Sequence, residues 1–152
     1  MVRRKNWVVL FTTLLLTLLG SYFLLKIGII DVEKIEAQGN DFHYNAISTS
    51  AVIGGFLFTG ISILISAISN ERIKRLWDNN YLDNLYRAAF VGMISNVLTI
   101  ITALTVLNCK IPPQIEKWFI WSEVITILVG VIFFAWCIRL LTFVISRLKE
   151  KK

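Results

Sequence analysis

The residues of this chain that could take part in chemistry are few. Inside its long apolar runs the candidates are Lys26, Asn96 and Glu123. Charged and amide side chains cost free energy in hydrocarbon, so each is a candidate for function by default. Glu123 has no evident partner for acid–base work, and the sequence supplies no set of nucleophile, base and orienting group. We therefore predict no catalysis and no cofactor.

Two of these side chains have three competing interpretations. Lys26 and Glu123 lie about four and about five residues inside their runs, or roughly 6 and 7.5 Å by the helical rise. Matching depths would allow an ion pair between them. Alternatively, Lys26 extends to the membrane surface and Glu123 lies in the interface beside Trp118 and Trp121. In the third interpretation, Glu123 residues from several copies ring a pore mouth. Asn96 is expected to bond to a neighbouring helix.

The single histidine lies beside an acidic stretch. His43 could bind a cation together with Asp41, Glu36 and Glu33. A solvated acidic loop is the commoner outcome for such a stretch, so we predict no metal site.

Composition predicts that these residues sit in a membrane protein. Hydrophobic residues make up 56% of the 152 residues and charged residues 17%, against about 25% charged in soluble domains. A soluble domain of this size exposes too much surface to hide so many apolar side chains. The net charge of +6 comes from clusters at the ends of apolar runs. That placement is typical of membrane topology and argues against direct binding of nucleic acid.

Four apolar segments are long enough to cross a bilayer, which takes about 20 helical residues. They cover residues 7–30, 44–68, 88–107 and 118–141, and the last continues as a helix to about residue 148. The first segment is too long for a signal peptide core. We predict an all-α fold with a single domain, residues 1–152, forming a bundle of four transmembrane helices.

Lysine and arginine predict the orientation, because cytoplasmic ends carry an excess of both. Twelve fall on one side and four on the other, which together are the 16 of the chain. The first group is Arg3, Arg4, Lys5, Arg72, Lys74, Arg75, Arg87, Arg139, Arg147, Lys149, Lys151 and Lys152. The second is Lys26, Lys34, Lys110 and Lys117. We expect a multi-pass protein of the cell membrane with both termini in the cytoplasm.

A basic and aromatic hairpin is predicted between the second and third segments, over residues 69–87. Asp78-Asn79-Asn80 is a turn signal within it. Its exposed side chains would form a surface for a cytosolic protein partner. The candidates are Arg72, Arg75, Trp77, Tyr81 and Tyr86.

The second segment carries a stripe of small residues at steps of three and four. Small residues mark contacts between helices in lipid because they allow close approach. The stripe has two interpretations, packing within the chain or an interface or pore lining in a homo-oligomer. Its members are Ser48, Ala51, Gly55, Thr59, Ser62 and Ser66.

The stretch GGFLFTGISILISAISNERIKRLWDNNYLDNLYRAAF joins a glycine-rich helix to the basic hairpin. It resembles small four-helix membrane proteins of bacterial antiphage defence, such as the membrane component of the Kiwa system. The resemblance implies a membrane subunit that senses infection or membrane perturbation and works with a cytosolic partner. It implies no site residue.

We therefore expect an oligomeric sensor or effector of the bacterial inner membrane, with an ion channel as one form it could take. The alternatives are a small four-helix transporter and an immunity or accessory protein. The first segment lacks the carboxylate that small multidrug transporters carry deep in helix one.

Overall fold

The described part of the chain is helical. The computed structural model describes residues 2–28, 31–66 and 81–149. Its helices are α1 (Val2–Lys26), α2 (Val32–Glu36), α3 (Asn40–Ser66), α5 (Tyr81–Asn108) and α6 (Pro113–Lys149). The predicted all-α class is confirmed for these residues. The first part of the predicted hairpin, residues 69–80, lies outside them.

Two glycines set the limits of α1 and α3. The helix expected over residues 7–30 begins at Val2 and ends at Lys26, and Gly28 follows with a φ of 78°. Gly39 has a φ of 59° and directly precedes Asn40, where α3 begins. Glycine adopts positive φ without the steric cost of a Cβ. Lys26 is therefore the last residue of α1 and not a residue one turn inside it.

Two other helix starts differ from expectation for local reasons. The Asp31 side chain accepts hydrogen bonds from the backbone N–H groups of Glu33 (3.0 Å) and Lys34 (3.2 Å), which starts the short helix α2. An aspartate in this position caps a helix by accepting from its first free N–H groups. The last apolar segment was expected to begin at residue 118, but α6 begins at Pro113. Proline suits that position because its missing N–H has no helical partner there.

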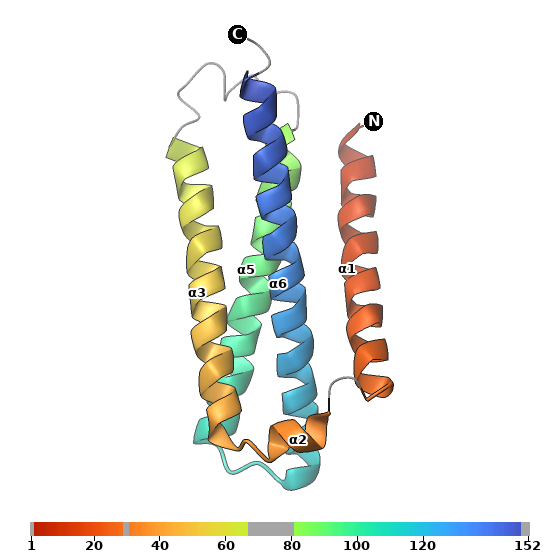
Figure 1. Cartoon of the computed structure of the whole chain (residues 1–152), viewed down its shortest axis with the longest axis vertical. Helices are drawn as coiled ribbons and strands as arrows, with labels where there is room; N and C mark the ends of the chain where they lie inside the picture. The colour runs from red at the N-terminus through yellow and green to blue at the C-terminus, as the bar shows by residue number, and fades with distance from the viewer. Residues whose placement is uncertain (1, 29–30, 67–80, 150–152) are drawn as a thin grey trace.

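The long helices run alternately up and down, and α1 lies beside a closer group of three (Figure 1). The central helix of that group is α5, which packs against both α6 and α3. Helix α1 touches α6 over a smaller contact. The start of α1 and the end of α6 lie at the same end of the bundle, and α2 crosses the opposite end (Figure 1). We call that opposite end the α2 end.

Glycines let the three central helices approach closely. A Cβ added to Gly92 of α5 would lie 2.8 Å from Leu57 Cδ1 and 3.4 Å from Phe133 Cβ. A Cβ added to Gly130 of α6 would lie 2.8 Å from the Asn96 amide nitrogen. Without the glycines, α3, α5 and α6 could not meet at these distances.

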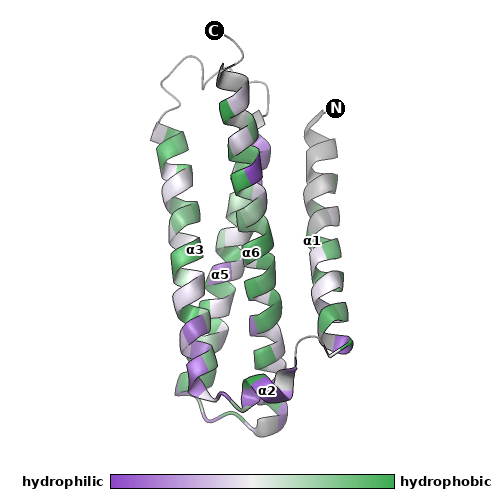
Figure 2. Ribbon diagram, in the orientation of Figure 1, coloured by the Kyte–Doolittle hydropathy of each residue, from purple (hydrophilic) through white to green (hydrophobic). Residues whose placement is uncertain are grey.

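The outer surface of the bundle is apolar. Asn40–Ser66, Leu82–Asn108 and Gln114–Phe143 are each long and apolar enough to cross a membrane. No more than 28% of the residues in their most apolar windows are buried inside the chain. Figure 2 shows hydrophobic residues along α3, α5 and α6 and hydrophilic ones around α2 and the start of α3. Exposed apolar surface of this extent requires lipid as its solvent. The apolar stretch described within α1 is Leu14–Leu24, which is shorter than the three candidate spans.

We predict that Gly130→Ala destabilises the bundle by about 1–3 kcal/mol, the usual cost of overpacking a close contact. The added methyl group must displace the Asn96 side chain. Thermal unfolding in detergent measures the effect. Gly60→Ala is the matched control, because a Cβ at Gly60 meets no atom within 4 Å. Equal unfolding temperatures for the two variants would contradict the close packing of α5 on α6.

Candidate functional site

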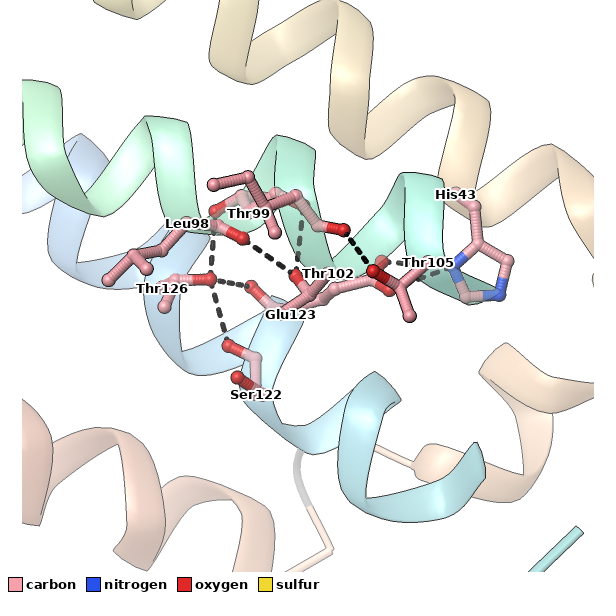
Figure 3. Close-up of polar contacts among 9 residues, drawn as sticks. His43, Leu98, Thr99, Thr102, Thr105, Ser122, Glu123 and Thr126 are labelled. Carbon is pink, nitrogen blue, oxygen red and sulfur yellow. Dashed lines mark hydrogen bonds and ion pairs between the residues drawn. The ribbon is translucent and has the colours of Figure 1, made fainter. Parts of the chain in front are cut away.

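A buried pair of ionisable side chains joins α3 to α6 near the α2 end. His43 Nδ1 lies 3.0 Å from Glu123 Oε1 and 2.9 Å from Glu123 Oε2. The exposed fraction is 4% for the His43 side chain and 0% for that of Glu123. Figure 3 shows the two residues facing each other from separate helices. Because the carboxyl group has no access to water, the imidazole is its polar partner.

His43 lies near the start of its helix, and apolar side chains lie beside the pair. His43 is the fourth residue of α3 and so belongs to its first turn. The ring of Phe42 lies edge-on to the imidazole, with centroids 5.5 Å apart. Ile120, one turn before Glu123, is also buried, with 2% of its surface exposed. Phe42 and Ile120 therefore place apolar groups beside the pair.

Hydroxyl groups form hydrogen bonds along the interface of α5 and α6, beginning three residues after Glu123. The Thr99 hydroxyl donates to Thr126 Oγ1 at 2.8 Å, and the Thr126 hydroxyl donates to the Ser122 carbonyl at 2.8 Å. Ser95 Oγ donates to the Thr126 carbonyl, also at 2.8 Å. Figure 3 shows Thr99 and Thr126. Two of these bonds cross between the helices, where hydrogen bonding adds to close packing as a source of association.

Asn96 lies at the inner limit of this polar region. It is 2% exposed, and its amide donates to the Gly92 carbonyl of its own helix at 2.7 Å. The expected bond to a neighbouring helix is not what holds it. Instead, its side chain packs against Gly130 of α6, and its Cβ would lie 3.6 Å from a Cβ built on Gly54 of α3. The amide therefore fills the space left by glycines on both neighbouring helices.

The buried polar side chains of the three central helices gather in one half of the core, among apolar ones such as Ala46 and Ile120. Toward the α2 end, the buried polar residues of the three central helices are His43, Ser50, Ser95, Asn96, Thr99 and Glu123. Toward the other end, the buried cluster is Leu57, Ile61, Leu82, Leu85, Ala88, Ala89, Val129, Phe133 and Cys137. We call the first set the polar half-core. Ser50 Oγ has no hydrogen-bond partner there, which is unusual for a buried polar atom.

This arrangement can hold a proton, because its two ionisable groups share one. A neutral imidazole donates its Nδ1 proton to the carboxylate, and the pair then has a charge of −1. An imidazolium makes the same contact with a total charge of zero. The described residues contain no group of three histidine, cysteine, aspartate or glutamate side chains arranged to hold a metal ion.

The interpretation that paired Lys26 with Glu123 is wrong in this structure. Both carboxylate oxygens of Glu123 contact His43, and Lys26 lies exposed at the end of α1. The reason is the early start of α3, which brings His43 into a helix and turns it inward. His43 likewise faces Glu123 and not the acidic loop with which it was considered as a cation site.

The small-residue stripe of α3 lies on the outside of the bundle. The inner face of α3 consists of His43, Ala46, Ser50, Leu57 and Ile61. The members of the stripe are exposed or half-exposed: Ser48, Ala51, Gly55, Thr59, Ser62 and Ser66. A Cβ at Gly55 would meet nothing within 4 Å. Ser62 and Ser66 donate to carbonyls of their own helix. The interpretation of the stripe as packing within this chain is therefore wrong.

The predicted partner surface is only partly described. Arg72, Arg75 and Trp77 lie outside the described residues. Tyr81 begins α5, and Tyr86 is exposed and stacks on Phe90 with ring centroids 6.3 Å apart. Tyr86 lies near the start of α5, away from the polar half-core.

Sequence reasoning missed His43 as the partner of Glu123. A signal was available in the spacing of His43, Ala46 and Ser50 along one helical face, which continues to Leu57 and Ile61. Residues three and four apart share a face. Extending the second apolar segment back to Asn40 would have placed the histidine on the packed side.

Fold and site together define a class, a helical membrane protein whose three-helix core holds a buried imidazole–carboxylate pair. Comparison with protein-family models, with curated proteins and with solved structures finds no match to this chain. Its function must therefore be argued from its own residues.

We predict that His43→Leu destabilises the protein by about 3–5 kcal/mol, because it leaves the Glu123 carboxylate buried without a partner. The double variant His43→Leu/Glu123→Leu should recover most of this loss, since neither charge remains. Unfolding in detergent measures both. Lys117→Gln is the control. It removes the exposed Lys117–Glu36 pair (3.6 Å) and should cost at most about 1 kcal/mol. Equal effects of the single and double variants would refute coupling between the two side chains.

Proposed function

We propose that this chain is a subunit of an oligomeric membrane sensor or effector and has no catalysis of its own. The observation that carries the proposal is the outward position of the small-residue stripe on α3. Inside the chain, α3 packs through its other face, so the stripe is available to a second copy. Small residues let two helices approach closely in lipid, where apolar bulk alone gives no preference between a helix and acyl chains.

The proposed topology has four spans with both termini in the cytoplasm. Three spans are α3, α5 and α6, and α1 is proposed as the fourth. The alternating directions of the four long helices support an even number of crossings (Figure 1). The excess of lysine and arginine at the end opposite α2 supports a cytoplasmic position for that end. In this orientation the polar half-core faces the outer leaflet.

The role in bacterial defence rests on the resemblance to antiphage membrane components. In that setting, a cytosolic protein would dock on the basic hairpin and on the end of α6. The proposal needs no direct contact with nucleic acid.

A small transporter is the second candidate, and the His43–Glu123 pair favours it. Intramembrane ionisable pairs are typical of proton relays in transporters. The structure gives Glu123 the partner that the sequence alone did not provide. Proton flux into liposomes that depends on Glu123 would favour the transporter over the sensor.

Assembly through α3 predicts that Gly55→Leu and Ser62→Leu reduce the oligomer to smaller species, because a bulky side chain separates the two helices. Each variant should still insert and keep its helix content. Light scattering in mild detergent measures the mass of the complex. Val97→Leu, at an exposed position of α5, is the matched control and should leave the mass unchanged. Wild-type mass for both α3 variants would remove the proposed interface.

The topology predicts that a membrane-impermeant maleimide labels Cys109 in intact cells. Cys109 lies exposed at the α2 end, directly after α5, whereas Cys137 is buried in the core. Cys109→Ser should abolish labelling. Labelling of Cys109 that appears only after the cells are opened would reverse the proposed orientation.

A further inference from the structure

We propose that His43 and Glu123 form a proton-binding site that couples the proton concentration at the α2 end to the packing of α3 on α6. Through α3, the site would regulate assembly of the complex. The regulatory part rests on the proposed function, whereas the proton site itself does not.

The first support is the geometry of the pair. One imidazole nitrogen contacts both oxygens of one carboxyl group, at 2.9 and 3.0 Å, with both side chains at least 96% buried. Such a pair can lose one proton and keep a hydrogen bond. The loss changes its total charge from zero to −1 in a region that water does not reach. The free energy of packing must therefore depend on whether the proton is present.

The second support is the position of the pair. Imidazole is the side chain whose charge changes nearest to physiological pH. His43 lies in the first turn of α3, next to the exposed Asp41. A proton from the aqueous phase at the α2 end has about one helical turn to cross.

Other ionisable groups at this end are solvated and do not share the site. They are exposed or half-exposed, so water and salt screen them. On α1, directly before α2 and on α2 they are Tyr22, Lys26, Asp31, Glu33, Lys34 and Glu36. On α3, the loop before α6 and α6 itself they are Asp41, Tyr44, Cys109, Lys110, Glu116 and Lys117. Glu36 and Lys117 pair with each other.

The third support is the double role of α3. His43 and the inner face of α3 hold the helix on the core, while the opposite face carries the small-residue stripe. Within the described residues, α3 contacts α5 far more than it contacts α6. The His43–Glu123 contact is thus a specific polar tie between two helices that otherwise touch little. Loosening it lets the start of α3 move together with the stripe.

The sign of the effect follows from charge. Protonation of the imidazole gives an ion pair without net charge, which holds α3 against α6. Removal of the proton leaves a buried carboxylate without an opposite charge. Raising the pH at the α2 end should therefore weaken the tie and the assembly.

The experiment uses the full chain in lipid nanodiscs and two readouts across about pH 5 to pH 8, the range where imidazole charge usually changes. His43 is the only histidine of the chain, so the imidazole ¹⁵N signals in NMR report this site without assignment. Chemical cross-linking at each pH measures the oligomer fraction. The variants are His43→Gln, Glu123→Gln and the control Lys117→Gln.

In the wild type and in Lys117→Gln, the imidazole signal and the oligomer fraction should change together with pH. The association constant should fall as pH rises, by at most about tenfold per pH unit for each proton linked to assembly. Both Gln variants should assemble to an extent that no longer depends on pH. The unfolding temperature of His43→Gln also measures how much the His43–Glu123 contact stabilises the fold.

The possible failures are distinguishable. A constant imidazole signal over the whole range, or the same signal in Glu123→Gln, overturns the proton site. An oligomer whose fraction ignores pH while the signal changes overturns the coupling and leaves the proposed function intact. A monomer at every pH in the wild type overturns the proposed assembly and the coupling, while the NMR readout still decides the proton site.

Discussion

Helices in hydrocarbon have no water to escape, so they must be held by close contact and by polar bonds. In this chain both kinds of force act at the same place. Gly92 and Gly130 remove the side chains that would keep α3, α5 and α6 apart, and the Asn96 amide occupies the space between them. The remaining contacts follow from this approach, because Thr99 and Thr126 reach each other only across closely packed helices.

The same constraint explains why one half of the core is polar. Side chains near the α2 end gain hydrogen bonds that lipid cannot offer, and some of them join neighbouring helices: His43 with Glu123, Ser95 with Thr126, and Thr99 with Thr126. Leu57, Phe133 and Cys137 fill the opposite half with ordinary packing. Packing alone holds the half of the core that contains Leu57, Phe133 and Cys137. The half toward the α2 end also contains the His43–Glu123 pair, whose charge depends on its proton.

The helical class and the long apolar runs could be predicted from composition and run length, because both depend on local sequence. The burial of His43 could not, since it depends on where α3 begins and on which face it turns to α6. The outward stripe of α3 shows the same limit. A row of small residues predicts a contact between helices. The positions of Ser50 and Leu57 on the packed face of α3 show that Gly55 faces away from α5 and α6. The start of α6 at Pro113 lies before the apolar run, because proline suits the first position of a helix whatever the hydropathy of the residues that follow.

Helix α6 has 37 residues, so it is about 55 Å long at 1.5 Å per residue. The hydrocarbon core is about 30 Å thick, and α6 therefore continues well beyond it as one uninterrupted rod. A straight helix without a break transmits a tilt from one end to the other. A displacement where Glu123 meets α3 would therefore also move the end of α6 that lies opposite α2.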